Sequence, residues 1–186
     1  RKLRHNCEKS NLKFLVAVKK NLVLIGMMGV GKSTLAKIVA KRVGLKFIDT
    51  DRNIEKKHSM KISEIFQKKG EEFFRQEEKK EVLESLNKND CVIALGGGAF
   101  INKITREKIL KNSISVWLQL NLKTLNFRIK WNKKRPLLHG ENTQIKINKL
   151  YSERKNIYRL AKYRINCNKL SKENIVEKII NFYEKQ

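Results

Sequence analysis

Residues 26–33, with the sequence GMMGVGKS, fit the pattern G-x-x-x-x-G-K-[ST] of a phosphate-binding loop. Glycines let backbone N–H groups curl around phosphate oxygens, because no Cβ atom stands in the way. We expect Lys32 to reach the β- and γ-phosphates of a nucleotide and the hydroxyl of Ser33 to bind Mg²⁺. The predicted nucleotide-binding residues of this loop are Gly29, Val30, Gly31, Lys32, Ser33 and Thr34.

The residues on either side of the loop indicate the strand and the helix that such a loop joins. Residues 21–25 (NLVLI) form a short apolar run, which is typical of a buried parallel strand. Leu35, Ile38, Val39 and Val43 then recur at helical spacing, which predicts a helix that begins near residue 33. Strand, glycine loop and helix in this order are the context that makes the motif specific.

Two aspartates, Asp49 and Asp51, follow the next predicted strand at residues 45–48. Ligands of open α/β sheets bind beyond the carboxyl ends of the strands. Asp49 is therefore a candidate for the Mg²⁺ shell or for the base that acts on an attacking hydroxyl. Asp51 is a candidate for accepting hydrogen bonds from substrate hydroxyls. The alternative is that both only form an Asx-turn and cap the next helix.

Residues 52–88 are predicted to be helical, with a break at Gly70. Arg75 lies among four glutamates of this segment, and two interpretations of it stay open. Its guanidinium can pair locally with Glu71 or Glu78, at helical spacings of four and three residues. Alternatively, its planar fork can hold the carboxylate of a substrate.

Three consecutive glycines, Gly96–Gly98, follow the third predicted strand at residues 91–95. Such a run loses much conformational entropy on folding, so it is expected where the backbone passes close to a ligand, the alternative being a flexible turn. Further strands are predicted at residues 114–118 and 163–166. Helices are predicted at residues 122–129, at 146–161 with Arg154, and after a capping Ser171.

The segment KWNKKRPLL at residues 130–138 is dense in cations and contains the only proline. We expect residues 130–145 to form a mobile lid that closes over phosphates and brings Arg135 to the transferring group. The alternative is a solvated basic loop.

The composition excludes several classes of protein. The formal net charge of +25 would fit a nucleic-acid binder, but 18 acidic residues are interleaved with the basic ones and no basic repeat carries aromatic residues. We therefore predict no nucleic-acid partner. No apolar run approaches the roughly 20 residues of a membrane helix, so no membrane partner is predicted. The three cysteines form no C-x-x-C motif, and we expect a cytoplasmic protein in which Cys91 and Cys167 are reduced, buried thiols.

Taken in order, these motifs resemble the shikimate kinase family. The resemblance runs from about Lys20 to the C-terminus and implies an α/β protein. It implies a three-layer αβα P-loop kinase fold with a five-stranded parallel sheet, a helical substrate-binding region at about 51–88 and the lid. Residues 1–20 are then a basic, loosely held extension and residues 21–186 the kinase domain. The markers are the phosphate loop, Asp49-Thr50-Asp51, residues 70–75, Gly96–Gly98, Arg135-Pro136-Leu137, and Glu153-Arg154 followed by Tyr158.

The resemblance also implies a reaction, which is the ATP- and Mg²⁺-dependent phosphorylation of the 3-hydroxyl of shikimate on the chorismate pathway to aromatic amino acids. Residue by residue, it implies that Asp51 binds shikimate hydroxyls, while Arg75 and Arg154 hold its carboxylate together with the backbone of Gly97.

The remaining implied roles concern the phosphates. Arg135 lies near them, Lys32 stabilises the γ-phosphate, Ser33 ligates Mg²⁺, and Asp49 acts on the metal shell or as base. Lys169 is a candidate for the adenine site, and we expect a monomer. Two alternatives stay open: another small-molecule kinase, for gluconate or a nucleotide, and a nucleic-acid-binding module.

Overall fold

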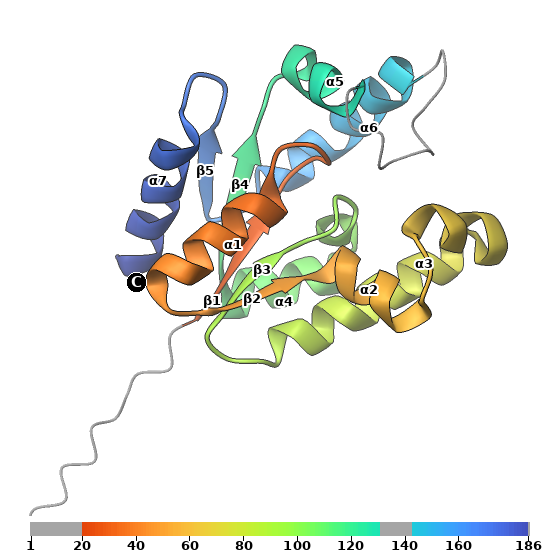
Figure 1. Ribbon diagram of the computed structural model, residues 1–186, viewed down its shortest axis with the longest axis horizontal. Helices are drawn as coiled ribbons and strands as arrows, with labels where there is room; N and C mark the ends of the chain where they lie inside the picture. Colours follow the sequence, from red (N-terminus) through yellow and green to blue (C-terminus); the bar gives the residue numbers. More distant parts are fainter. Residues whose placement is uncertain (1–19, 131–142, 186) are drawn as a thin grey trace, which may run out of the picture.

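A five-stranded parallel sheet forms the centre of the molecule, as the computed structural model in Figure 1 shows. The structure describes residues 20–130 and 143–185. The strand order is β2-β3-β1-β4-β5, and every pairing is parallel. The predicted strands are confirmed to within one residue at each end. They are β1 (Asn21–Ile25), β2 (Lys46–Asp49), β3 (Cys91–Ala94), β4 (Ser113–Gln119) and β5 (Tyr163–Asn166).

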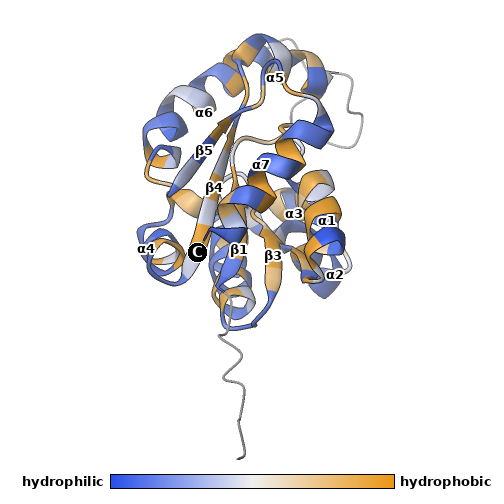
Figure 2. Ribbon diagram, turned by 90° about the vertical axis from the view of Figure 1, so that its left-hand side faces the viewer, coloured by the Kyte–Doolittle hydropathy of each residue, from blue (hydrophilic) through white to orange (hydrophobic). Residues whose placement is uncertain are grey.

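Helices cover both faces of this sheet, which confirms the predicted three-layer arrangement. Helices α1 (Lys32–Val43) and α7 (Lys172–Glu184) pack against each other on one face. Helix α4 (Lys103–Asn112) packs against β4 on the opposite face, and Figure 2 shows the apolar strands between the two helical layers. The predicted cap of α7 is present, because the Ser171 hydroxyl accepts a hydrogen bond from the Asn174 N–H at 3.1 Å.

Helices α2 (Thr50–His58) and α3 (Ile62–Leu86) pack on each other beyond the β2 edge of the sheet (Figure 1). They enclose a small core of their own, made by Ile54, Ile65 and Phe74. Helix α3 is interrupted at Gly70, whose φ of 82° and ψ of 169° lie in a region that is essentially restricted to glycine. The predicted break at Gly70 is therefore confirmed.

A buried carboxylate, Glu77 of α3, ties these two helices together. It accepts hydrogen bonds from Lys57 at 2.9 Å, from Lys80 at 3.0 Å and from His58 at 2.9 Å. The bonds from Lys57, Lys80 and His58, in this order of weight, lower the pKa of Glu77 to about 2. Glu77 is therefore ionised at neutral pH and fixes α2 on α3.

The remaining elements are α5 (Leu122–Lys130), the 3₁₀ helix η1 (Ala99–Ile101) and α6 (Thr143–Tyr158). Helix α6 was predicted at 146–161 but lies three residues earlier. It ends at Tyr158 because the next hydrogen bonds tighten to three-residue turns, from Leu160 N–H to the Ile157 carbonyl and from Ala161 N–H to the Tyr158 carbonyl, both 3.1 Å.

The two ends of the predicted lid therefore belong to helices, Lys130 to α5 and residues 143–145 to α6. The rest of the lid, residues 131–142 with Arg135, lies outside the described residues, as do residues 1–19 of the predicted extension. Of the predicted buried cysteines, Cys91 and Cys167 are confirmed as free, buried thiols. Among the described helices, none is long and apolar enough to cross a membrane.

Candidate active site

The phosphate-binding loop connects the carboxyl end of β1 to the start of α1. Gly26, Gly29 and Gly31 have φ angles of 144°, 81° and 101°, which side chains disfavour. A Cβ atom on Gly26 would also lie 2.6 Å from the carbonyl oxygen of Leu118 in β4. The loop closes around Lys32, whose buried ammonium donates to the carbonyl oxygens of Gly26 at 2.8 Å and Met27 at 3.0 Å.

A small pocket of about 190 Å³ opens in front of this loop. It brings the ammonium group of Lys32 and the hydroxyl of Ser33 together with the carboxylates of Asp49 and Asp51. The sequence predicted these four side chains for one site. Arg128 of α5 adds a further cation beside the loop, since it donates to the Val30 carbonyl at 3.4 Å. The pocket is lined by Gly29, Gly31, Lys32, Ser33, Thr34, Asp49, Asp51 and Leu95.

The two aspartates occupy different positions around the end of β2. Asp49 is the N-cap of α2 and accepts a hydrogen bond from the Arg52 N–H at 3.2 Å, so the capping alternative is realised for Asp49. It lines the small pocket as well, and the two roles are compatible. Asp51 lies against Gly96, where an added Cβ would overlap its Oδ1 atom. Between them, the buried Thr50 accepts a hydrogen bond from Gly96 N–H at 2.9 Å.

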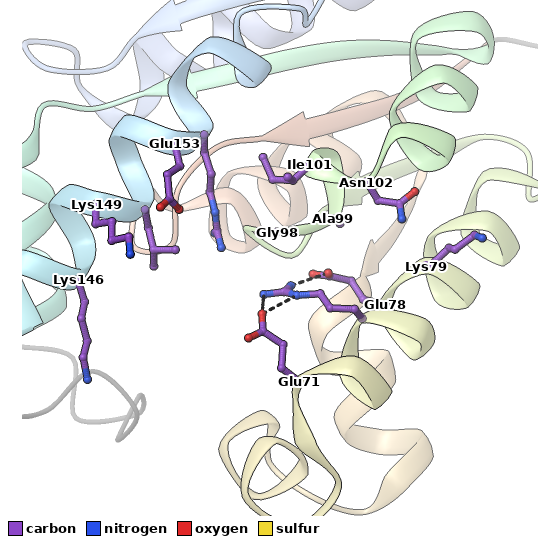
Figure 3. A pocket seen from close by; sticks show the side chains of 13 residues that line it. Glu71, Glu78, Lys79, Gly98, Ala99, Ile101, Asn102, Lys146, Lys149 and Glu153 are labelled. Atoms are coloured by element: carbon purple, nitrogen blue, oxygen red, sulfur yellow. Dashed lines mark hydrogen bonds and ion pairs between the residues drawn. The ribbon is translucent and has the colours of Figure 1, made fainter.

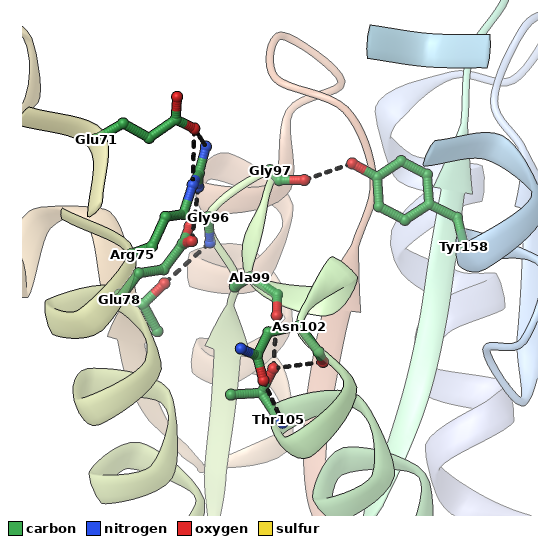
Figure 4. Close-up of polar contacts among 10 residues, drawn as sticks. Glu71, Arg75, Glu78, Gly96, Gly97, Ala99, Asn102, Thr105 and Tyr158 are labelled. Carbon is green, nitrogen blue, oxygen red and sulfur yellow. Dashed lines mark hydrogen bonds and ion pairs between the residues drawn. The ribbon is translucent and has the colours of Figure 1, made fainter. Parts of the chain in front are cut away.

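Arg75 makes both of the local pairs that its sequence neighbourhood offers. Its Nη1 donates to Glu78 at 2.7 Å, and its Nε and Nη2 donate to Glu71 at 3.2 and 3.1 Å (Figure 4). Glu78 is 4% exposed. Burial raises the pKa of Glu78, the Arg75 charge opposes that rise, and the Asp51 charge adds to it. The pair thus holds the guanidinium in place at the wall of a second pocket.

This second pocket, of about 700 Å³, lies between α3, the glycine run and α6. It brings together Arg75 and Arg154, the two arginines that the family resemblance assigns to one carboxylate. Figure 3 shows Lys149 and Glu153 of α6 facing Gly98 across the pocket. The lining residues are Glu71, Arg75, Glu78, Lys79, Gly98, Ala99, Ile101, Asn102, Lys146, Lys149, Leu150, Glu153 and Arg154.

Each glycine of the run faces a different charged side chain. At Gly96, an added Cβ would overlap Asp51 and lie 2.6 Å from Glu78. At Gly97, it would lie 3.5 Å from Nη1 of Arg154. At Gly98, it would overlap Arg75. Gly96 and Gly98 are therefore required by close approach to the site, whereas a Cβ on Gly97 would make only an ordinary van der Waals contact. Among the described residues, the N–H groups of Gly97 and Gly98 have no hydrogen-bond partner, which leaves two adjacent donors beside the arginines.

Gly98→Ala is expected to raise the KM of a small-molecule substrate bound in the second pocket about tenfold, equivalent to about 1.4 kcal/mol. The KM of a nucleotide bound at the phosphate-binding loop should change little. The backbone at Gly98 has a φ of −95°, which alanine tolerates, while the new Cβ would lie 3.0 Å from Cζ of Arg75 and displace that side chain. Steady-state kinetics and a melting curve check this expectation. A large loss of thermal stability with an unchanged acceptor KM would contradict it.

A parallel sheet that carries a phosphate-binding loop, beside a pocket with two arginines, defines a P-loop phosphotransferase with an anionic small-molecule acceptor. The model of the family described as shikimate kinase matches residues 28–184. The chain belongs to the shikimate kinase family.

The relatives and solved structures agree with this assignment. The chain is 44% identical over 161 residues to the shikimate kinase of Sulfurihydrogenibium sp., covering 87% of this chain and 96% of that protein. It is 41% identical over 159 residues to the shikimate kinase of Bartonella henselae, covering 86% of this chain and 76% of that protein. The structure of shikimate kinase from Acinetobacter baumannii in complex with shikimate matches with a TM-score of 0.84 and 33% identity, covering 90% of this chain and 94% of that one.

A gluconokinase from Sinorhizobium meliloti matches with a TM-score of 0.58 at 13% identity, covering 90% of this chain and 93% of that one. At this identity the likeness shows a shared fold and nothing about the substrate. Because the matching family model and the relatives named above are shikimate kinases, the alternative of another small-molecule kinase, for gluconate or a nucleotide, is not favoured.

Proposed function

We propose that the two adjoining pockets hold the two substrates of a shikimate kinase, ATP at the phosphate-binding loop and shikimate between α3, the glycine run and α6. The reaction is the transfer of the γ-phosphoryl group of ATP to the 3-hydroxyl of shikimate, a step in the biosynthesis of aromatic amino acids. The observation that carries the acceptor assignment is the convergence of Arg75 and Arg154 on one pocket beside the donors of Gly97 and Gly98.

In the acceptor pocket, we assign the shikimate carboxylate to Arg75 and Arg154, to the N–H of Gly97 and to the adjacent N–H of Gly98. Two guanidinium groups and two backbone donors suit a carboxylate, because charge-assisted hydrogen bonds are short and strong. Asp51 would accept hydrogen bonds from the substrate hydroxyls. Its carboxylate lies against Gly96 and also lines the phosphate pocket, so it stands where an acceptor hydroxyl would meet the nucleotide.

In the phosphate pocket, the N–H groups of residues 29–34 would hold the phosphates and Lys32 would stabilise the charge that develops on the transferring group. Arg135 would add a second cation there. This role rests on the sequence pattern alone, because Arg135 lies outside the described residues. Asp49 would act on the metal shell or as the base for the acceptor hydroxyl.

The family uses ATP with Mg²⁺, and the donors in the small pocket fit that ion. Ser33 and Asp49 supply oxygen atoms, which Mg²⁺ prefers. Among the described residues, no cluster of three or more His, Cys, Asp or Glu could form an all-protein cage. This matches the usual Mg²⁺ site of a kinase, in which one or two protein oxygens join water and the nucleotide phosphates. When bound, the ion neutralises charge on those phosphates.

A coupled assay of ADP release tests the reaction, with Mg-ATP and each of three acceptors: none, shikimate and gluconate. We expect release that depends on shikimate, no increase with gluconate, and loss of activity after chelation of Mg²⁺ that added Mg²⁺ restores. Turnover with gluconate at the shikimate rate, or no turnover with shikimate, would refute the acceptor assignment.

We also propose that the enzyme acts as a monomer in the cytoplasm without a nucleic-acid partner. Sedimentation velocity at assay concentration tests the monomer, with a dimer as the contrary result.

A further inference from the structure

Tyr158, the last residue of α6, connects three parts of the site that are far apart in the sequence. It is 0% exposed. Its hydroxyl donates to the carbonyl oxygen of Gly97 at 2.5 Å (Figure 4) and lies 3.8 Å from the sulfur of Met27 in the phosphate-binding loop. Arg154 lies beside the same glycine, with its Nη1 3.5 Å from where a Cβ on Gly97 would stand, and its charge opposes the rise of the Tyr158 pKa that burial causes.

The hydrogen-bonding capacity of a phenol fixes the direction of each contact. A tyrosine has one O–H proton, and the carbonyl of Gly97 can only accept it. Arg154 carries donors only, so it cannot compete with the Gly97 carbonyl for this proton. Burial raises the pKa of Tyr158 to about 12, so the hydroxyl keeps its proton at neutral pH.

The bond to Gly97 determines how the glycine run presents its N–H groups. Other polar groups of the run are held locally: Gly96 N–H by Thr50, and the carbonyls of Gly96 and Gly98 by the N–H groups of Ala99 and Ile101, at 3.2 and 2.9 Å. In a trans peptide the N–H of Gly98 points away from the carbonyl of Gly97. Since that carbonyl faces Tyr158, the N–H of Gly98 faces the opposite side. Two glycines in sequence would otherwise leave this peptide unit free to turn over.

We propose that Tyr158 is a positioning residue for the acceptor carboxylate, acting through the Gly97–Gly98 peptide. This inference rests on the proposed placement of shikimate. The hydroxyl sets the direction of the Gly98 N–H through the Gly97 carbonyl, and it also contacts the sulfur of Met27 in the phosphate-binding loop. Packing alone would need only the aromatic ring, which lies 6.1 Å from the ring of Trp117 between centroids.

The test is Tyr158→Phe, which removes the hydroxyl and keeps the ring. We expect the KM of shikimate to rise about tenfold, and the KM of ATP to stay within about twofold. The matched control is Tyr151→Phe on the same helix. Tyr151 is buried too, but its hydroxyl accepts from Gln119 at 3.4 Å, and we expect wild-type kinetics from this variant.

A second measurement compares shikimate with an analogue in which a hydroxymethyl group replaces the carboxylate. The ratio of kcat/KM for the two acceptors is independent of the folded fraction of each preparation. We expect Tyr158→Phe to lower the ratio of kcat/KM for shikimate to kcat/KM for the analogue about tenfold. The substitution weakens binding of the carboxylate, which the analogue lacks. An unchanged ratio would overturn the proposal even if overall activity fell. Failure of the wild-type enzyme to phosphorylate shikimate would instead refute the proposed function, so the two failures are distinguishable.

Discussion

Lys32→Met is expected to lower kcat by about 100- to 1,000-fold, while the affinity for shikimate remains close to that of the wild type. Methionine keeps most of the volume of the lysine stem and removes only the ammonium group. In the free enzyme this group donates to two carbonyls of its own loop, Gly26 and Met27. In the proposed reaction, this ammonium group would stabilise the γ-phosphoryl oxygens in the transition state, where the transferring group needs positive charge.

Single-turnover kinetics with Mg-ATP would measure the chemical step of this variant, and calorimetry with shikimate would measure acceptor binding separately. The matched control is Lys37→Met, an exposed lysine on the same helix, from which we expect wild-type rates. A kcat within about threefold of the wild type would refute the assignment of Lys32 to the transferring group, given that loss of one such donor usually has a far larger effect.

The elements that local sequence specifies were predictable almost in full. The phosphate-binding loop has its pattern, its preceding apolar strand and its following helix within about 25 residues, and each of these is confirmed. The break at Gly70 was also predictable, because a single glycine inside a helical pattern is a local signal. The start of α6 was placed too late because the polar residues before Ile147 obscure the helical period.

Contacts between distant segments were beyond the sequence. Thr50 holds Gly96 across 46 residues and Tyr158 holds Gly97 across 61, and no local pattern joins these partners. For Arg75 the sequence left a local pair and a ligand contact as alternatives; the fold shows the local pairs with Glu71 and Glu78 and places Arg75 at the wall of the larger pocket. Its partner Glu78 looked like any helical glutamate, and only the packing of α3 against the glycine run shows that it is buried beside Gly96.

Arg75→Ala is expected to reduce kcat/KM for shikimate by about 100-fold through KM, because a charged hydrogen-bond donor is worth roughly 1.5–3 kcal/mol. The KM of ATP should change little. The same substitution removes the partner of Glu78, a buried carboxylate that would then need a proton. We therefore expect a second effect, on stability, that is independent of substrate.

The stability effect has a defined pH dependence. The pKa of Glu78 is already raised by burial, and without the opposing charge of Arg75 it should rise further. Because the carboxyl pKa is raised in the folded state, folding takes up a proton at pH values above the ordinary carboxyl pKa of 4.5. Stability is then highest below that value and falls as pH rises toward the folded-state pKa. Melting curves of Arg75→Ala should therefore show a deficit against wild type that grows from pH 5 to pH 8.

Glu78→Gln added to Arg75→Ala separates the two effects. An amide in place of the buried carboxylate removes the ionisable group, so the double variant should regain thermal stability at pH 8 and lose the pH-dependent deficit. Its KM for shikimate should stay raised, because the guanidinium is still missing. If the double variant recovered shikimate binding together with stability, Arg75 would act only by neutralising Glu78. A persistent defect in binding would instead assign the guanidinium to the substrate carboxylate, with Glu78 as the group that holds it there.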